Sequence, residues 1–198
     1  MFGKGEFMNS IKLIVGLGNP GSQYTNTRHN AGFWFVDTLC KKYGFDLKDN
    51  KKFYGEAANV DINNHSVWLL KPMTYMNHSG KALQSLTQFY KIKPEEILVA
   101  YDELDLPPGT VKLKKGGGHG GHNGLRDIIS LIGSNEFYRI RLGIGHPGHK
   151  SQVVSWVLNR ASSDDEISIN NAIDKSLAVL EDLLDGQLEK ATRELHTR

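Results

Sequence analysis

The densest group of residues that could bind a ligand lies in the segment Gly-Gly-Gly-His-Gly-Gly-His-Asn-Gly at residues 116–124. Six of its nine residues are glycine, which loses more backbone entropy on folding than any other residue. His119, His122 and Asn123 interrupt the glycines and can form hydrogen bonds or transfer protons. The basic residues that flank the segment are Lys112, Lys114, Lys115 and Arg126. This pattern predicts a loop whose backbone approaches a ligand that carries phosphate.

The chemistry that the sequence favours is a histidine and a carboxylate acting on water. A serine hydrolase with a nucleophile elbow would need the pattern G-x-S-x-G, which does not occur in the chain. Histidine titrates near neutral pH, and a carboxylate partner orients its ring and stabilises its protonated form. Asp102 follows the apolar run at 97–101, so a buried strand would hold this carboxylate rigidly. A lone aspartate at such a place can also simply form a turn or cap a helix.

Two other kinds of site are compatible with these residues. His119, His122 and His146 could bind a metal ion, although a glycine-rich loop is poorly suited to fixing ligand geometry and no cysteine lies nearby. The segment GLGNPG at 16–21 matches the dinucleotide fingerprint and follows an apolar run. Pro20 and Gly21 predict a turn there rather than the helix start that binds pyrophosphate. A nicotinamide-dependent oxidoreductase is therefore a minor alternative.

Alternating strands and helices must position these groups. Hydrophobic periodicity predicts strands at residues 11–15, 53–62, 66–70, 97–101, 111–114 and 138–144, the second and third forming a hairpin. It predicts helices at residues 30–43, 79–90, 125–132, 153–158 and 164–184, with Gly44 ending the first. This mixture indicates an α/β fold with a mixed sheet and helices on both faces.

Polar groups follow five of the predicted strands. In open α/β sheets, ligands bind beyond the carboxyl ends of the strands. Asn19, Tyr24 and His29 follow the strand at 11–15, Asn77 follows that at 66–70, and Asp102 follows that at 97–101. The glycine-rich loop follows the strand at 111–114, and His146 and His149 follow that at 138–144. We expect these five strand exits to meet at one edge of the sheet.

Composition limits the class of protein. The 198 residues are 39% hydrophobic and 23% charged, which suits one globular domain with a core. A net charge of +2 restricts any site for a polyanion to a local patch. The single cysteine, Cys40, cannot form an intramolecular disulfide and favours a reducing compartment. We find no run of transmembrane length and no signal peptide. Residues 1–10 are interpreted as an N-terminal extension, natural or vector-derived, and residues 11–198 as a single domain.

Six segments of the chain together resemble the bacterial peptidyl-tRNA hydrolases. They are VGLGNPG at 15–21, Tyr24 with TRHNAG at 27–32, KPMTYMNHSG at 71–80, YDELDLPPG at 101–109, GGGHGGHNGLRD at 116–127 and RIRLGIGHPG at 139–148. They occur in the family's order and span most of the chain. The first seven residues fall outside the pattern, and the tail after Arg160 carries little family signal.

The resemblance implies a monomeric α/β domain with a twisted mixed sheet between helices, acting in the cytoplasm. The implied activity is hydrolysis of the ester that joins the C-terminus of a peptide, or of an N-acylated amino acid, to the 3′ ribose of tRNA. This reaction recycles tRNA from aborted translation. We expect no metal, no cofactor and no membrane contact. The partner would be the acceptor stem and 3′ CCA end of peptidyl-tRNA, together with its peptide.

The resemblance also assigns catalytic roles. His29 falls on the family's catalytic histidine and Asp102 on its aspartate partner. His29 would take a proton from water as the water attacks the ester carbonyl, while Asp102 fixes the tautomer of the ring. Asn19, Asn77 and Asn123 fall on the amides that bind peptide and water. An asparagine amide or a loop N–H would stabilise the oxyanion, and the sequence leaves open which asparagine holds the water.

Further residues are implied to contact the tRNA or the peptide. Tyr24 falls near the junction of the terminal adenosine and the peptide, Met76 beside the peptide, and His122 on a histidine implicated in substrate binding. The cations implied to meet RNA phosphates are Lys112, Lys114 and Arg141. Such contacts predict an affinity that falls steeply with salt.

Three interpretations remain open at this point. His146 is interpreted as a structural hydrogen-bonding residue, with a role at the site as the alternative. Residues 153–158 would form either a mobile lid or an ordinary packed helix. An RNA-binding module without catalysis would retain the basic residues and break the pair of His29 and Asp102.

Overall fold

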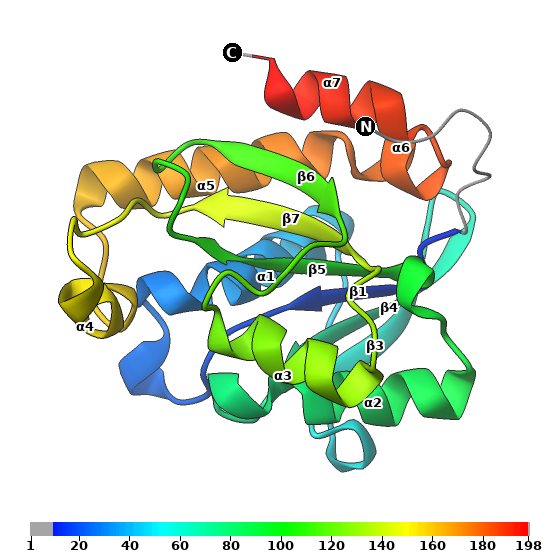
Figure 1. Ribbon diagram of the computed structural model, residues 1–198. Coiled ribbons are helices and arrows are strands. Elements are labelled where there is room, and N and C mark those ends of the chain that lie inside the picture. The colour runs from blue at the N-terminus through cyan, green and yellow to red at the C-terminus, as the bar shows by residue number, and fades with distance from the viewer. Residues whose placement is uncertain (1–9, 198) are drawn as a thin grey trace.

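The computed structural model describes residues 10–197, so residues 1–9 of the predicted N-terminal extension lie outside the described residues. Seven strands form one sheet in the order β2-β3-β4-β1-β5-β7-β6 (Figure 1). In chain order they are β1 (Leu13–Gly16), β2 (Lys48–Asn50), β3 (Gly55–Ile62), β4 (His65–Pro72), β5 (Ile97–Glu103), β6 (Val111–Lys115) and β7 (Tyr138–Gly143). Strands β4, β1, β5 and β7 run parallel to one another, whereas the pairs β2–β3, β3–β4 and β6–β7 are antiparallel. The predicted mixed sheet is confirmed.

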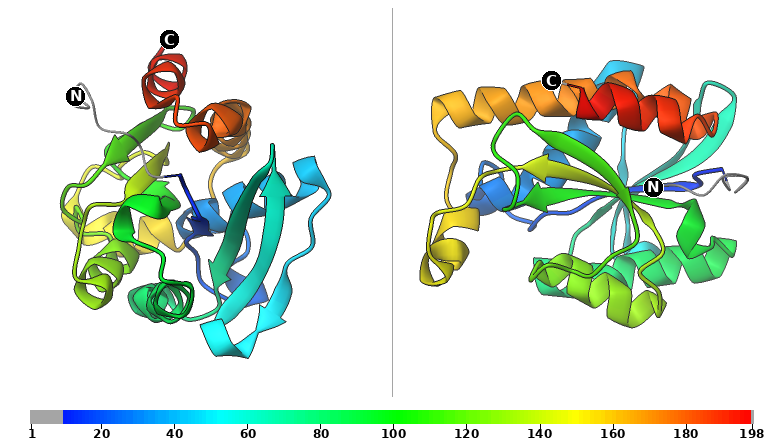
Figure 2. Two further views of the ribbon diagram at one scale, coloured as in Figure 1. Left: turned by 90° about the vertical axis from the view of Figure 1, so that its right-hand side faces the viewer. Right: turned by 45° about the horizontal axis from the view of Figure 1, so that its top comes forward.

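Helices cover both faces of the sheet, as predicted. They are α1 (Ala31–Tyr43), α2 (Ser79–Tyr90), α3 (Asn123–Ile132), α4 (Val153–Val157), α5 (Ser163–Ala178), α6 (Leu180–Leu184) and α7 (Leu188–His196). Helices α1, α5, α6 and α7 pack on one face, and α2 and α3 on the other (Figures 1 and 2). None of the helices in residues 10–197 is long and apolar enough to cross a membrane.

The alternation of side chains along β1 explains why two cores form. Ile14 packs into the core under α1 and α5, while Leu13 and Val15 pack into the core under α2 and α3. All three side chains are buried, since a central parallel strand is covered on both faces.

The backbone of helix α1 lies in direct contact with the backbone at the end of β1. A Cβ atom on Gly16 would lie 2.1 Å from the carbonyl oxygen of Gly32, and one on Gly32 would lie 2.4 Å from that of Ala100. Only glycine permits this contact. The helix ends where the sequence predicts, because Gly44 adopts the left-handed conformation with φ 73°.

The main errors of the sequence prediction concern short elements and element boundaries. Strand β2 was not predicted, because Lys48–Asn50 contains no apolar residue. Helix α7 was also missed, although its buried residues Leu188, Ala191 and Leu195 recur at helical spacing. The helix predicted at 164–184 is two helices, with a break at Val179 (φ −102°, ψ 3°). Phe53 belongs to a 3₁₀ turn at Lys51–Phe53, so β3 begins only at Gly55.

Four of the five strand exits lie at one edge of the sheet, and the fifth does not. Strands β4, β1, β5 and β7 all end at the carboxyl edge. Strand β6 runs antiparallel to β7, with Lys115 beside Tyr138, so β6 ends at the opposite edge. The glycine-rich loop must therefore run back along the sheet before α3 begins (Figure 1).

Candidate active site

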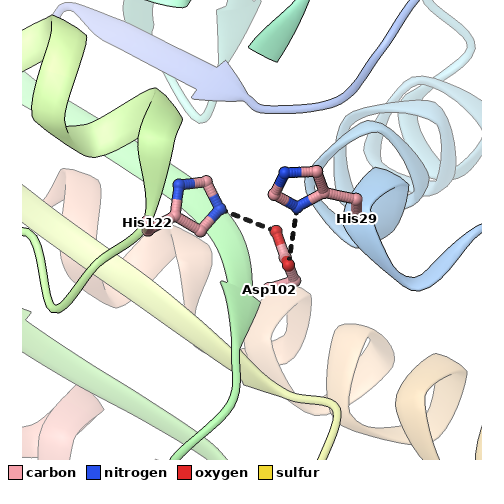
Figure 3. Close-up of side chains that lie close together, drawn as sticks. All are labelled: His29, Asp102 and His122. Carbon is pink, nitrogen blue, oxygen red and sulfur yellow. Dashed lines mark hydrogen bonds and ion pairs between the residues drawn. The ribbon is translucent and has the colours of Figure 1, made fainter. Parts of the chain in front are cut away.

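Two histidines share one buried carboxylate at the carboxyl edge of the sheet (Figure 3). The Nδ1 atom of His29 lies 2.8 Å from Oδ2 of Asp102, and the Nε2 atom of His122 lies 2.8 Å from Oδ1. Asp102 is the penultimate residue of β5, His29 lies in the 3₁₀ turn Arg28–Asn30 and His122 precedes α3. The predicted pair of His29 and Asp102 is thus formed, and the binding module that would break it is disfavoured. The second histidine on the carboxylate was not predicted.

The two histidines differ in the ring nitrogen that remains free. His122 caps α3, since its Nδ1 accepts a hydrogen bond of 3.3 Å from the backbone N–H of Leu125, and its Nε2–H donates to Asp102. Both of its nitrogens are therefore engaged. His29 uses Nδ1 toward Asp102, and its Nε2 faces away from the carboxylate without a hydrogen-bond partner among residues 10–197 (Figure 3). Of the two rings, His29 alone has a lone pair available to accept a proton.

Burial and charge act in opposite directions on the pKa values of this group. Desolvation lowers the pKa of His29, but the charge of Asp102 and its hydrogen bond outweigh burial and leave the pKa raised. Desolvation raises the pKa of Asp102, but the two histidines outweigh it and hold that pKa well below its ordinary value. Asp102 is therefore ionised at neutral pH and stabilises the imidazolium form of His29.

A pair of hydrogen bonds fixes Asn19 next to the turn that carries His29. The backbone N–H of Asn19 donates to Oδ1 of Asn30 at 2.8 Å, and Nδ2 of Asn30 donates to the carbonyl of Asn19 at 3.0 Å. The side-chain Oδ1 of Asn19 accepts from the backbone N–H of Met76 at 2.7 Å. This bond orients the amide, so its Nδ2 remains available as a donor. Asn30 was not predicted, although it directly follows His29 in the TRHN motif.

A pocket of about 610 Å³ opens over the two histidines. The predicted site residues that line it are Asn19, His29, Met76, Asn77, Asp102, His122 and Asn123. They come from the segments after β1 and β4, from the end of β5 and from the start of α3, so the fold gathers residues far apart in sequence. The side chain of Asn123 also accepts a hydrogen bond of 3.3 Å from Arg126.

Two carbonyl groups in the first half of the glycine-rich loop are bound by a buried arginine. Arg139 of β7 donates from its two Nη atoms to the carbonyls of Gly117 and Gly118, both at 2.6 Å. The second half, from His119 to His122, lines the pocket. Arg139 was not predicted to act here; the alternating pattern of β7 placed it on one face without indicating its partner.

The residues implied to meet tRNA lie outside the pocket. Lys112 and Lys114 are exposed on the edge strand β6. Arg141 lies beside Lys112 on β7 and is paired with Glu103, whose carboxylate lies 3.2 Å from Nε. Tyr24 contacts Tyr75 of the pocket wall edge-on, with ring centroids 6.3 Å apart.

The alternative sites do not form as the sequence suggested. Residues 10–197 contain one group of three side chains whose possible metal-ligand atoms lie within 4.8 Å of one another. This group is His29, Asp102 and His122, so the predicted cluster of His119, His122 and His146 does not form. The ring nitrogens of His119 and His146 instead accept backbone N–H bonds of 2.9 Å from nearby glycines, and both residues also line the pocket.

The dinucleotide fingerprint is also not realised. Gly21 precedes a 3₁₀ turn of three residues, Ser22–Tyr24, instead of an α-helix. A Cβ atom on Gly18 would lie 2.6 Å from the ring of Phe33, so this glycine makes room for a side chain of α1 rather than for a pyrophosphate.

Comparison with known proteins identifies the family that shares this arrangement. The sequence model of the family described as "Peptidyl-tRNA hydrolase" matches residues 13–198, including the tail in which the motifs carried little signal. A peptidyl-tRNA hydrolase of Neisseria meningitidis serogroup A is 55% identical over 190 residues, covering 96% of this chain and 99% of the relative. One from Xanthomonas campestris pv. campestris is 54% identical over 96% of this chain and 98% of the relative. A crystal structure of the enzyme from Acinetobacter baumannii superposes with a TM-score of 0.93 and 51% identity, covering 98% of both chains.

Proposed function

This chain belongs to the peptidyl-tRNA hydrolase family, and from that premise we propose that His29 is the general base for hydrolysis of the ester bond in peptidyl-tRNA. One observation carries the assignment: of the two histidines on Asp102, only His29 has a free ring nitrogen facing away from the carboxylate. The pocket beside that nitrogen is large enough for the end of a peptide and a ribose.

In the proposed reaction, His29 Nε2 accepts a proton from a water molecule as the water oxygen bonds to the ester carbonyl carbon. The Nδ1–H donates to Asp102 throughout, which keeps the tautomer fixed and stabilises the imidazolium. The ester C–O bond then breaks, and the imidazolium returns the proton to the 3′ oxygen of the ribose. The products are intact tRNA and a free peptide, whose new carboxylic acid releases a proton to solvent and becomes a carboxylate. A ribose oxygen is a better leaving group than an amine, so no covalent nucleophile is needed.

The oxyanion of the tetrahedral intermediate requires a preorganised donor, and we assign this role to Asn19. The bond from Met76 N–H to its Oδ1 holds the amide in one orientation before substrate arrives. Asn77 and Asn123 are the other amides of the pocket, and they would bind the main chain of the peptide. Because the main chain is common to all peptides, selectivity among side chains should be weak.

The acceptor stem would lie along the basic edge of the sheet. Lys112 and Lys114 are exposed there, and Arg141 is next to them on β7. We propose that these cations bind phosphates of the stem while the 3′ CCA end enters the pocket. A monomer acting in the cytoplasm, where peptidyl-tRNA arises, is part of the same proposal.

The test is release of free peptide and intact tRNA from an N-acetylated aminoacyl-tRNA by wild type, His29→Ala and the control His149→Ala. The exposed ring of His149 bonds to its near neighbour Ser151, so its removal should leave turnover unchanged. We expect His29→Ala to reduce kcat by a factor of about 10² to 10⁴ and to retain tRNA affinity. Turnover that persists in His29→Ala would overturn the assignment, and His122→Ala would then be the variant to measure. Loss of wild-type activity with a chelator would indicate a metal-dependent reaction instead.

A further inference from the structure

A buried arginine next to the proposed base binds the helix that forms one wall of the pocket. Arg28 is 6% exposed. Its Nη1 donates to the carbonyl of Trp156 at 3.0 Å and to that of Asn159 at 3.3 Å. Its guanidinium carbon lies 3.6 Å from the centroid of the Trp156 ring. Arg28 thus contacts the end of α4 both by hydrogen bonds and by stacking.

These contacts cap the C-terminal end of α4. The last carbonyls of a helix have no partner within the helix, and a cation close to them is favourable. The main chain adds to the junction, since the backbone N–H of Arg28 donates to the carbonyl of Asn159 at 3.1 Å and Thr27 forms a β-bridge with Arg160. The α4 helix is therefore joined at its C-terminal end to the turn that carries His29.

The burial of this arginine is only partly compensated by its contacts. Its Nε atom is buried and has no hydrogen-bond partner among residues 10–197. An unsatisfied buried donor opposes folding. Desolvation also lowers the pKa of Arg28, and the charge of Asp165 only partly compensates. A group that is held at such a cost, one residue from His29, is a candidate for a functional role.

Helix α4 presents an apolar surface to the pocket. The residues that line the pocket from this side are Val153, Val154, Val157 and Leu158. Val154 is 69% exposed, although it is apolar, because it faces this open space. Asn19, His29 and His122 provide polar groups to the same pocket. One side of the pocket is thus suited to an apolar, non-reacting part of the substrate.

We propose that Arg28 is a positioning residue that holds α4 at a fixed distance from His29 and so sets the width of the substrate pocket. The proposal rests on the proposed function for its kinetic consequences. A wall that touches a non-reacting part of the substrate contributes equally to ground-state and transition-state binding, so its displacement raises KM more than it lowers kcat. An arginine that acted through His29 would instead lower kcat.

The kinetic test compares Arg28→Lys and Arg28→Gln with Arg160→Gln. Arg160 is a matched control because its side chain is 66% exposed, pairs with Glu166 and follows the same helix. We expect Arg28→Gln to raise KM roughly tenfold with kcat within about twofold, Arg28→Lys to have a smaller effect, and Arg160→Gln to behave as wild type. An unchanged KM, or a fall in kcat at constant KM, would overturn the proposal.

Hydrogen exchange tests the same point without any activity. The amides of residues 153–158 should exchange faster in Arg28→Gln than in wild type and Arg160→Gln, whereas those of α2 should be unchanged. If Arg28→Gln does not fold, Arg28→Lys replaces it, because an ammonium keeps the positive charge but lacks the planar guanidinium that stacks on the Trp156 ring. Unaltered exchange of α4 in Arg28→Lys would then contradict the proposal. Failure of His29 as the base would leave the exchange result intact, so the two proposals can fail separately.

Discussion

The cluster of His29, Asp102 and His122 and the basic edge of the sheet are built in opposite ways. In the cluster, the side chains of His29, His122 and Asp102 are 10%, 9% and 1% exposed, and each makes a short, directed hydrogen bond. On β6, Lys112 and Lys114 are exposed, and neither has an ion-pair partner among residues 10–197. Proton transfer requires atoms within about 3 Å of one another, whereas phosphate attraction extends over about 10 Å at moderate salt. For the roles proposed for them, each region has only the order that its task requires.

Among the substitutions that test this contrast, Asp102→Asn is expected to have the largest effect. Its amide keeps the shape of the carboxylate but cannot accept from both histidines, so we expect kcat to fall by about 10² to 10⁴ with tRNA affinity unchanged. The control is Asp49→Asn, an exposed aspartate on β2. A change in tRNA affinity comparable with the loss of kcat would break the distinction between the two regions.

The pH profile gives the same experiment a second readout. His29 must be unprotonated to act as a base, so kcat/KM should fall as the pH drops through its pKa. Asp102 raises that pKa above the ordinary value of 6.5, so the fall should begin above pH 6.5 in the wild type. In Asp102→Asn the acid limb should move to lower pH, because the charge that favours imidazolium is gone while burial still opposes it. An unshifted limb would mean that another group titrates.

An intermediate effect is expected for the double substitution Lys112→Gln with Lys114→Gln. The slope of log affinity for tRNA against log salt concentration should decrease in magnitude by roughly 0.7 to 0.9 for each phosphate that is no longer neutralised. The value of kcat at saturating substrate should stay constant. The matched control removes two exposed lysines elsewhere, Lys41→Gln with Lys48→Gln. A slope that is unchanged, or that changes equally in the control, would show that β6 does not bind phosphates.

The smallest effect concerns how the basic strand itself is held. His196 of α7 covers the free edge of β6, since its Nε2 accepts a hydrogen bond of 3.1 Å from the backbone N–H of Leu113. Replacing His196 by alanine should lower the free energy of unfolding by about 0.5–1.5 kcal/mol at pH 8, measured by urea denaturation, and should leave turnover unchanged.

The stability that His196 provides should depend on pH. Burial, together with the neighbouring cations Lys112, Lys175 and Arg141, lowers its pKa in the folded protein. The folded state therefore favours the neutral ring, so the contribution is complete above pH 6.5 and is lost as the pH falls from there through the folded-state pKa. At pH 5 the difference between wild type and His196→Ala should be smaller than at pH 8. A difference that is equal at both values would contradict the bond.

The contrast between the regions also explains what could be predicted from sequence. Strands and helices with clear apolar periodicity were predicted to within a few residues, and Asp102 was placed at the end of a buried strand because its neighbours are apolar. The antiparallel course of β6 was missed, since no local pattern of Val111–Lys115 reveals the direction in which the strand pairs. The bond from His122 to Asp102 was missed because it joins segments that meet only in the folded sheet. Local signals and the family resemblance together identified the groups, but neither showed which atom of each group remains free.

The backbone contact between Gly16 and Gly32 limits how far the site can shift when side chains of the surrounding core are substituted. Core side chains can be exchanged for others of similar volume, and a packed interface usually shifts slightly in response. Here main chain lies against main chain, so the start of α1, two residues after His29, cannot follow such shifts relative to the strand ends. The spacing between the His29 turn and the end of β5 is thus set by two positions at which any side chain would clash with backbone.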